Sequence, residues 1–211
     1  MLPTREEMQK ALELRHGKEL QDKFGKATVA VCGLGGLGSN VAIALARAGV
    51  GRLHLIDFDI VDLANLNRQQ YEVLQMGEYK TDAMKCILSK IAPYCNVVTD
   101  AVKLDDDNIG DILKDDSIVC ECFDNPESKA VLVNTVSELF PEKYIVAASG
   151  MSGLYSTNTI RTKKIAKKFY VCGDGECSVE KDGTMFATRV MCCAAHEANT
   201  VLRIIAEKFE A

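Results

Sequence analysis

The sequence predicts an α/β fold, Rossmann-like and doubly wound, with a mostly parallel sheet and helices on both of its faces. Short continuous apolar runs alternate with segments of helical spacing, which is typical of buried parallel strands joined by crossover helices. Apolar residues make up 47% of the 211 residues and charged residues 26%, a globular composition. No repeat and no linker rich in Pro, Gly or Ser interrupts the chain. We therefore expect a single domain over 1–211 that includes an N-terminal helical segment over 1–26.

The first half of the chain opens with helix and then alternates strand and helix. Residues 4–23 carry apolar side chains at helical spacing, and Thr4 precedes Glu7 by three positions as in a capping box, so one or two amphipathic helices are expected. The helix predicted over 80–91 ends before Pro93, because the residue before a proline disfavours helical backbone. Strands are predicted over 27–33, 52–59 and 96–101, and helices over 40–48 and 80–91.

The second half of the chain continues the alternation and then loses it. Strands are predicted over 117–124 and 144–149, a helix over 127–139, and a short helix after the run Asp105–Asp107. Residues 150–160 contain glycine and are expected to be partly extended. The polar segment 162–184 predicts a loop or a hairpin and carries Lys163, Lys164, Lys167 and Lys168. A last helix is expected over 189–208, where apolar residues return at helical spacing.

Charge and hydropathy exclude several classes of protein. The chain has 25 basic and 30 acidic residues, a net charge of −5, and no strong basic cluster. This balance argues against a binder of nucleic acid or of a membrane surface, although it leaves room for a local basic patch. No apolar run is long enough to span a bilayer, and the first residues lack the apolar core of a secretory signal. We therefore expect a cytoplasmic protein.

The cysteines do not predict a disulfide framework, because their number, nine, is odd and the sequence has no secretory signal. Cys32, Cys120 and Cys122 lie in apolar runs and are expected to be small buried side chains. Thiol chemistry or metal binding is therefore considered only for the remaining candidates near the C-terminus, which are Cys172, Cys177, Cys192 and Cys193.

A glycine-rich loop follows the first predicted strand and opens the next helix. Its glycines are Gly33, Gly35, Gly36 and Gly38. Glycines at this place let the backbone turn tightly and let a phosphate approach the helix N-terminus. Asp57 ends the next predicted strand, 24 residues after Gly33, where an acid can bond ribose hydroxyls. By itself the loop predicts a nucleotide site, with a dinucleotide dehydrogenase as the default and an unliganded turn as the alternative.

The segment after Asp57 is unusually rich in polar side chains. Asn and Arg side chains at this position can hold phosphate oxygens and neutralise their charge. Such a set suits attack at phosphorus better than hydride transfer; the alternative is an ordinary solvated loop. The residues are Asp57, Asp59, Asn65, Asn67, Arg68 and Gln69.

Two further charged residues stand at positions where ligands bind. Lys80 begins a predicted helix, against the preference of the helix dipole, so either a bound anion or simple solvation accounts for it. Asp124 ends the strand predicted over 117–124, at the sheet edge where ligands sit in open α/β folds. Its carboxylate either holds Mg²⁺ beside nucleotide phosphates or caps the helix that follows Pro126, a role that Asn125 can also fill.

Together these motifs resemble the ThiF/MoeB/HesA family of ubiquitin-activating-enzyme-like adenylyltransferases. The resemblance rests on four motifs: GLGGLGSN at 33–40, DFDxVxxxNLNRQ at 57–69, the lysine Lys80, and FDN at 123–125. The resemblance covers residues 27–150, and the later SGMSG, VCGDG and AAHEAN are similar to the short branch called ThiF family 2.

The resemblance implies a single ThiF-type nucleotide-binding adenylation domain that uses ATP and Mg²⁺. It implies a nucleotidyltransferase that activates the C-terminal glycine carboxylate of a ubiquitin-like sulfur carrier, such as ThiS of thiamine biosynthesis. The products are an acyl-adenylate and pyrophosphate, and the enzyme is expected to be a homodimer that binds neither membrane nor nucleic acid. Because the nucleophile is already an anion, catalysis requires positioning and charge neutralisation rather than a general base.

The resemblance also implies a role for each motif residue. Arg68, Lys80 and Asp124 are implied to be catalytic, the first two through phosphate contacts and Asp124 as the magnesium ligand. Asp57 is implied to bind the ribose. The implied ATP-binding set is Gly33, Gly35, Gly36, Gly38, Asp57, Asp59, Asn65, Asn67, Arg68, Gln69, Lys80, Asp124 and Asn125.

The chain departs from longer family members at its cysteines and at its N-terminus. Those members bind zinc through two C-x-x-C pairs, whereas Cys172 and Cys177 are too far apart and Cys192 and Cys193 are adjacent in a helical pattern. Structural zinc is therefore not expected. Cys172 or Cys177 either forms a covalent link to the carrier or has no role. The family's N-terminal arginine is not assigned, because neither Arg5 nor Arg15 lies at the usual distance from the glycine loop.

Three alternatives remain open at this point. The first is a member of the same superfamily with another substrate, such as a tRNA threonylcarbamoyladenosine dehydratase. The second is an NAD-dependent oxidoreductase, against which Arg68, Lys80 and Asp124 argue. The third is an idle binding module for a ubiquitin-like protein, against which the complete set of polar motif residues argues.

Overall fold

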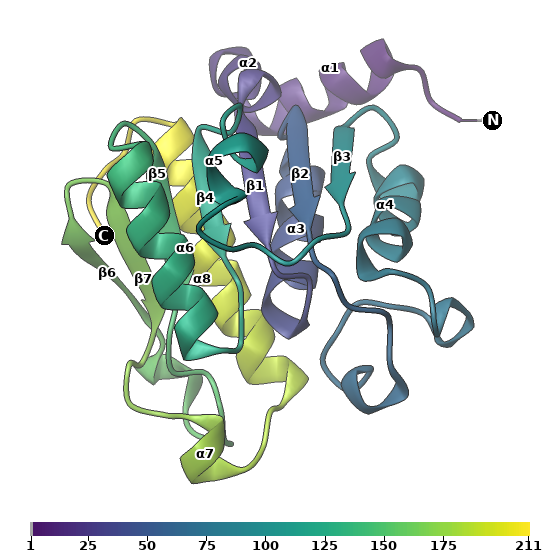
Figure 1. The fold of residues 1–211 in the computed structure, drawn as a ribbon. Helices are drawn as coiled ribbons and strands as arrows, with labels where there is room; N and C mark the ends of the chain where they lie inside the picture. Colours follow the sequence, from purple (N-terminus) through teal and green to yellow (C-terminus); the bar gives the residue numbers. More distant parts are fainter. Residues whose placement is uncertain (1) are drawn as a thin grey trace.

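One seven-stranded sheet with the order β3-β2-β1-β4-β5-β7-β6 organises the molecule (Figure 1). The computed structural model describes residues 2–211. All neighbouring strands are parallel except β6 and β7, which pair antiparallel at one edge. The predicted α/β, doubly wound, mostly parallel fold is thus confirmed. The strands are β1 Thr28–Cys32, β2 Arg52–Ile56, β3 Asn96–Asp100, β4 Ile118–Glu121, β5 Tyr144–Ala148, β6 Arg161–Ala166 and β7 Phe169–Gly173.

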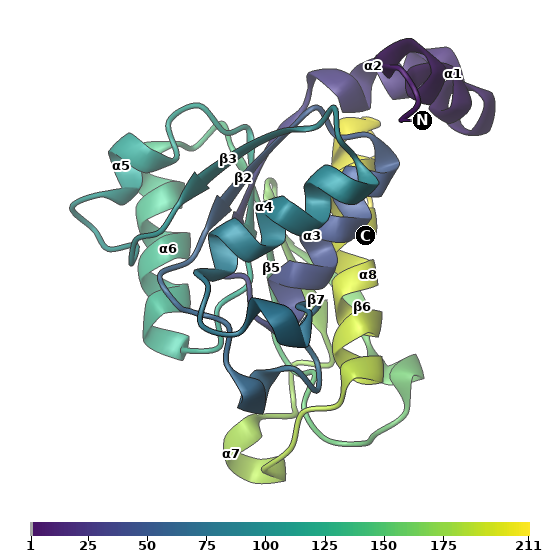
Figure 2. The ribbon, with the colours of Figure 1, turned by 90° about the vertical axis from the view of Figure 1, so that its right-hand side faces the viewer.

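Helices cover both faces of the sheet, as Figures 1 and 2 show from two sides. One face carries α3 Gly36–Ala48, α4 Lys80–Ile91 and α8 Ala187–Ile205, and the other carries α5 Ile109–Ile112 and α6 Pro126–Leu139. Each face has its own apolar core, because the side chains of a strand alternate between the two sides. Among residues 2–211, no helix combines the length and the apolar character that a membrane span requires.

Two N-terminal helices, α1 Arg5–His16 and α2 Lys18–Lys26, lie at the end of the sheet opposite the strands' carboxyl ends (Figure 1). The predicted capping box is confirmed: Thr4 accepts a hydrogen bond from Glu7 N at 3.2 Å, and Thr4 N donates to the Glu7 carboxylate at 2.8 Å. Arg5 donates to the carbonyl of Tyr94 at 3.2 Å. This arginine is therefore bound within its own chain, far from the glycine loop.

The sequence predicts a loop or a hairpin over 162–184, and the first part of this segment forms the hairpin β6–β7, which extends the sheet. The short helix α7 over Val179–Asp182 is not among the predicted elements. Helix α3 also begins at Gly36, four residues earlier than predicted, because the glycine loop itself enters the helix. Short 3-10 turns are η1 Leu63–Asn65, η2 Val73–Gln75 and η3 Thr157–Thr159.

The order of the strands places a crevice between β1 and β4. The chain moves outward from β1 through β2 to β3 and then returns to the other side of β1 as β4. Connections after β1 and after β4 therefore leave in opposite directions. In doubly wound sheets, ligands bind at the carboxyl ends of the two strands that flank such a switch point.

A buried charged network joins β2, the end of β3 and the segment just before β4. His54 of β2 is 2% exposed, and its two ring nitrogens lie 2.7 Å from carboxylate oxygens of Asp116 and Asp100. Arg52 donates to the other oxygen of Asp116 at 2.6 Å. Burial lowers the pKa of His54, but the hydrogen bonds to Asp116 and Asp100 outweigh it, so the pKa lies above its ordinary value.

We predict that this network makes the protein more stable at mildly acidic than at mildly basic pH. Because the folded-state pKa of His54 is raised, its contribution is complete below the unfolded pKa and is lost as pH rises through the folded pKa. The free energy of unfolding in urea should therefore fall as pH rises from about 6.5, the ordinary His pKa, through the raised folded-state pKa. His54→Gln should flatten this dependence and destabilise the protein by about 3–5 kcal/mol, since it removes one partner of a buried pair. An unchanged pH dependence in the variant would contradict the assignment.

Candidate active site

The glycine loop between β1 and α3 is shaped by two close backbone contacts. Gly33 has φ +92°, and a Cβ there would lie 2.9 Å from the carbonyl oxygen of Cys122. A Cβ on Gly38 would lie 1.8 Å from the carbonyl oxygen of Gly33. Helix α3 has Gly35 as its N-cap and no side chain capping its first turn. The N–H groups of that turn are therefore available to an anion, which the helix dipole also favours.

Asp57, at the end of β2, holds the glycine loop in place. One carboxylate oxygen accepts a hydrogen bond from Leu34 N at 2.6 Å, and the other accepts from Asp59 N at 2.8 Å. Burial raises the pKa of Asp57, while Lys80 and the two backbone donors partly oppose the shift. The carboxylate predicted to bind ribose thus also connects β2 to the loop after β1.

Lys80 begins α4 as predicted, but it is not a solvated lysine. The residue is only 4% exposed, and its Nζ lies 2.7 Å from an oxygen of Asp59 and 4.0 Å from one of Asp57. The side chain of Asp59 is 49% exposed. A buried ammonium group held by a half-exposed carboxylate can exchange that partner for another anion at little cost, because water solvates the released carboxylate.

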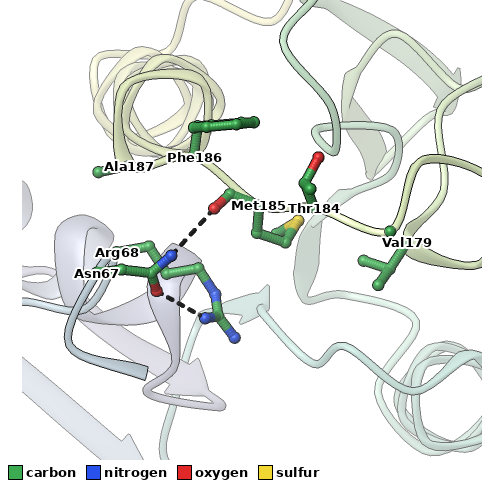
Figure 3. A pocket seen from close by; sticks show the side chains of 8 residues that line it. Asn67, Arg68, Val179, Thr184, Met185, Phe186 and Ala187 are labelled. Carbon is green, nitrogen blue, oxygen red and sulfur yellow. Dashed lines mark hydrogen bonds between the residues drawn. The ribbon is translucent and has the colours of Figure 1, made fainter. Parts of the chain in front are cut away.

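Arg68 carries a positive charge that no carboxylate neutralises within residues 2–211. Its guanidinium donates to Asn67 Oδ1 at 3.0 Å (Figure 3). It also donates to Asn65 Oδ1 at 3.3 Å, and both acceptors are neutral. Its aliphatic stem lies over the start of α3, where a Cβ on Gly36 would be 3.1 Å from Arg68 Cγ. The free cation and the N-terminus of α3 therefore act on the same space.

A pocket of about 530 Å³ lies beside Arg68. Figure 3 shows Asn67 on one wall, donating to the carbonyl of Met185 at 3.2 Å on the opposite wall. We call this the Arg68 pocket; its lining residues are Asn67, Arg68, Val179, Gly183, Thr184, Met185, Phe186 and Ala187.

Gln69 supplies an unsatisfied acceptor next to the glycine loop. The residue is 7% exposed, and its Oε1 has no hydrogen-bond partner among the described residues. Its Nε2 would lie 3.9 Å from a Cβ on Gly35. Buried polar atoms are nearly always paired, so this amide fits a site that receives a donor group, such as a ribose hydroxyl or an adenine amino group, from a bound nucleotide.

The two functions considered for Asp124 fall to different residues. Asn125 caps α6 by accepting hydrogen bonds from Glu127 N at 2.9 Å and Ser128 N at 3.0 Å. The carboxylate of Asp124 is exposed, and no described residue bonds it. It stands just past β4, across the switch point from the glycine loop. Asp124 is therefore free to hold a cation such as Mg²⁺, which proteins usually bind through one or two carboxylates plus substrate phosphates.

The cysteines fit the expected thiol chemistry poorly. Cys172 is not in a surface loop but in β7, fully buried, and burial raises its pKa to about 12. Cys177 is half-buried, and its Sγ donates to Asp174 at 2.8 Å, which raises its pKa. Both groups are held as thiols rather than as reactive thiolates. Within residues 2–211, no three His, Cys, Asp or Glu side chains form a metal-binding group.

Arg189 is the residue that sequence reasoning missed. It is 1% exposed and pairs with Asp174. It also donates to three backbone carbonyls and one hydroxyl of the loop between β5 and β6, at Ser152, Tyr155, Ser156 and Thr159. The sequence held one signal, because Arg189 lies in the first turn of α8, where the helix dipole disfavours a cation as it does at Lys80.

Comparison with known proteins identifies the chain. The model of the ThiF family matches residues 8–210. This chain belongs to the ThiF family. The resemblance predicted from the glycine loop and the DFDxVxxxNLNRQ segment is thus confirmed.

The ThiF-family relatives differ in their functions and in the length that they share with this chain. The adenylyltransferase and sulfurtransferase UBA4 of Scheffersomyces stipitis is 39% identical over 132 residues, 62% of this chain and 29% of the relative. The tRNA threonylcarbamoyladenosine dehydratase of Bacillus subtilis is 48% identical over 87 residues, 41% of this chain and 34% of the relative. The chain thus spans about a third of these curated relatives.

A solved structure shares the fold along nearly its whole length. The E. coli tRNA threonylcarbamoyladenosine dehydratase in complex with ATP has a TM-score of 0.86 and 23% identity, and the superposition covers 99% of this chain and 98% of that chain. This likeness confirms the architecture described above.

We predict that Gly38 and Gly35 respond differently to the same substitution. Gly38→Ala places a Cβ against the carbonyl of Gly33 and should prevent folding of the loop, with a loss of roughly 3 kcal/mol or more from overpacking. Gly35→Ala has φ −70° and open space, so its stability should match the wild type. In thermal melts, ATP with Mg²⁺ should stabilise Gly35→Ala less than the wild type. Equal melting temperatures of the two unliganded variants would refute the structural role of Gly38.

We also predict that Arg189→Met releases the segment between β5 and α8. The change leaves Asp174 and the loop carbonyls without their buried donor, which should cost about 3–5 kcal/mol. Limited proteolysis should then cut first within 149–186. The matched control is Arg203→Met on the same helix, whose partner Glu210 is exposed; the control should resist cleavage as the wild type does.

Proposed function

We propose that this protein is an ATP-dependent adenylyltransferase that transfers AMP to a carboxylate and releases pyrophosphate. The observation that carries the proposal is the uncompensated guanidinium of Arg68, whose stem lies over the uncapped N-terminus of α3. A dehydrogenase site needs no such free cation, and an idle binding module needs neither Arg68 nor the buried Lys80. The unsatisfied Gln69 and the exposed Asp124 support the same conclusion.

The proposed chemistry uses groups already in place. A carboxylate oxygen of the substrate attacks the α-phosphorus of ATP, and the bond from that phosphorus to the bridging oxygen of pyrophosphate breaks. The nucleophile is an anion, so the residues act by positioning and by neutralising charge. Arg68 and Lys80 would contact phosphate oxygens, Lys80 after exchanging Asp59 for them. Asp124 would hold Mg²⁺, which would neutralise charge on the phosphates.

Among possible substrates, the comparisons favour the carboxylate of threonylcarbamoyladenosine in tRNA. Support comes from the 48% identity to the Bacillus subtilis dehydratase and from the end-to-end match to the E. coli dehydratase fold. Loss of water between a carboxylate and another group of the same nucleoside requires that a carboxylate oxygen leave. After adenylation, that group attacks the carboxyl carbon, and AMP leaves with the oxygen in place of hydroxide. The proposed activity therefore accounts for an ATP-dependent dehydration.

The second candidate is the C-terminal carboxylate of a ubiquitin-like sulfur carrier, as in thiamine biosynthesis. Its support is the 39% identity to a relative named as an adenylyltransferase and sulfurtransferase. The homodimer expected from the resemblance stays a prediction, as does the cytoplasmic location.

The test is incubation of the protein with ATP and Mg²⁺ and with either a tRNA that bears threonylcarbamoyladenosine or a set of carriers. We expect pyrophosphate release with the tRNA and a product nucleoside lighter by one water in mass spectrometry. Formation of an adenylated carrier instead would select the second candidate. Stabilisation by NAD in place of ATP in thermal melts would overturn the adenylyltransferase itself.

We predict that Arg68→Gln and Lys80→Gln each lower the rate of pyrophosphate release by roughly a hundredfold to a thousandfold, the cost of removing one preorganised charge donor. Lys85→Gln is the control, because Lys85 is an exposed residue of the same helix as Lys80. Wild-type rates in both site variants would exclude the proposed roles.

A further inference from the structure

The edge strand β6 and the turn that follows it carry a row of cations that the proposed chemistry does not use. Residues 157–173 contain no acidic side chain, although the whole chain has 30 acidic against 25 basic residues. The cations of the β6 segment are Arg161, Lys163, Lys164, Lys167 and Lys168. A positive segment in a net-acidic protein indicates a local role for the charge, because it does not follow from composition.

Two of these five cations serve the fold and three are free. Lys164 donates to the carbonyl of Phe209 at 2.8 Å, and Lys168 donates to the carbonyl of Glu142. The side-chain nitrogens of Arg161, Lys163 and Lys167 are bonded by no residue of the described chain, and all three residues are exposed.

The alternation of the strand separates the free cations from the protein core. Thr162 contacts His196 of α8 at 3.2 Å, so its side of the strand faces the molecule. Because side chains alternate along a strand, Arg161 and Lys163 share the opposite face. They are about two residues apart along an extended backbone, which spaces their charges by roughly 6–7 Å.

A second pocket lies where this strand begins. It has a volume of about 600 Å³, and we call it the β6 pocket. Of its acidic residues, Asp174 pairs with Arg189, Asp182 accepts from the hydroxyls of Ser152 and Tyr155, and the side chain of Glu176 has no partner among the described residues. The side chains of its cations Arg161, Lys163 and Lys181 have no bonding partner among the described residues. The lining residues are Tyr155, Thr159, Arg161, Lys163, Asp174, Glu176, Cys177, Lys181 and Asp182.

The β6 pocket and the Arg68 pocket flank one short segment of the chain. Val179, Gly183 and Thr184 line the Arg68 pocket, whereas Lys181 and Asp182 line the β6 pocket. Figure 1 shows this segment, α7, at the same end of the molecule as the loops that follow β1 and β2. A ligand that enters both pockets would therefore cross α7 and continue along β6.

We propose that the β6 pocket and the exposed face of β6 bind the phosphodiester backbone of an RNA whose reacting nucleoside enters the Arg68 pocket. The inference rests on the proposed adenylation site and locates the remainder of its substrate. Successive free Arg and Lys side chains along an extended strand suit a chain of phosphates. Tyr155, whose ring is fixed by its hydroxyl bond to Asp182 at 2.9 Å and is 54% exposed, offers a surface on which a base stacks. That ring favours RNA over an acidic protein.

The test measures fluorescence anisotropy of a labelled tRNA, without ATP, over a series of salt concentrations. The variant carries Arg161→Gln, Lys163→Gln and Lys167→Gln together. It should bind roughly tenfold or more weakly than the wild type, and the slope of log K against log salt should shrink by about 2–3, since each lost phosphate contact removes 0.7–0.9. The charge-matched control is Lys10→Gln, Lys18→Gln and Lys26→Gln on α1 and α2, three exposed lysines that should leave binding and slope unchanged.

Each other outcome overturns the proposal. Equal loss in the variant and in the control shows that only net charge matters, and undisturbed binding in the variant places the RNA elsewhere. Binding of labelled polyglutamate without any binding of tRNA indicates an acidic protein as the partner. Unfolding of the variant is excluded by its thermal melt, because the substituted side chains make no internal bonds. Failure of the proposed function is distinguished by a separate measurement: the thermal melt of the wild type would then show no stabilisation by ATP with Mg²⁺.

Discussion

The candidate site depends on the contact between the Cα of Gly38 and the carbonyl oxygen of Gly33, where no side chain fits. This approach lets α3 begin directly after β1, so that the free N–H groups of its first turn face the crevice between β1 and β4. Asp57 then fixes the loop to β2 through Leu34 N at 2.6 Å. Every other group of the site is positioned relative to this loop. The anion-binding character of the site therefore follows from backbone packing before any charged side chain contributes.

Of the two cations at the candidate site, one has a carboxylate as its partner and the other does not. Lys80 is buried and paired with Asp59, whereas Arg68 has only amide partners. A buried ammonium group without a counter-ion would be costly, so Asp59 allows the site to fold while it is empty of phosphate. Since Asp59 is half-exposed, water replaces Lys80 as its partner when an anionic ligand arrives. Arg68 is half-buried and has only neutral amide partners, so its charge is available to an anion from the start.

Sequence reasoning predicted most of the fold and most of the residues of the candidate site, for a physical reason. Parallel strands buried on both faces leave continuous apolar runs, and their carboxyl ends meet at one edge, so the residues after β1, β2 and β4 converge. The hairpin β6–β7 was less clear because an exposed edge strand has no apolar run, and its polar residues read as a loop. Lys80 appeared solvated because its partner Asp59 lies 21 residues away and meets it only in the fold. The burial of Cys172 was hidden in the same way, since β7 gains its cover from α8.

Arg189 explains how one short segment can serve two pockets. Its guanidinium binds acceptors on Ser152, Tyr155, Ser156, Thr159 and Asp174, which joins the loop after β5 to the loop after β7. The chain from Asp174 to α8, which forms the wall shared by the two pockets, is thereby tied to the sheet at its first residue and to α8 at its last. Asp182 of this segment accepts from Ser152 and Tyr155, and the carbonyl of Met185 accepts from Asn67, so moving the segment would break these hydrogen bonds. The pockets are therefore preformed, and a substrate that occupies both pays little to order the protein around it.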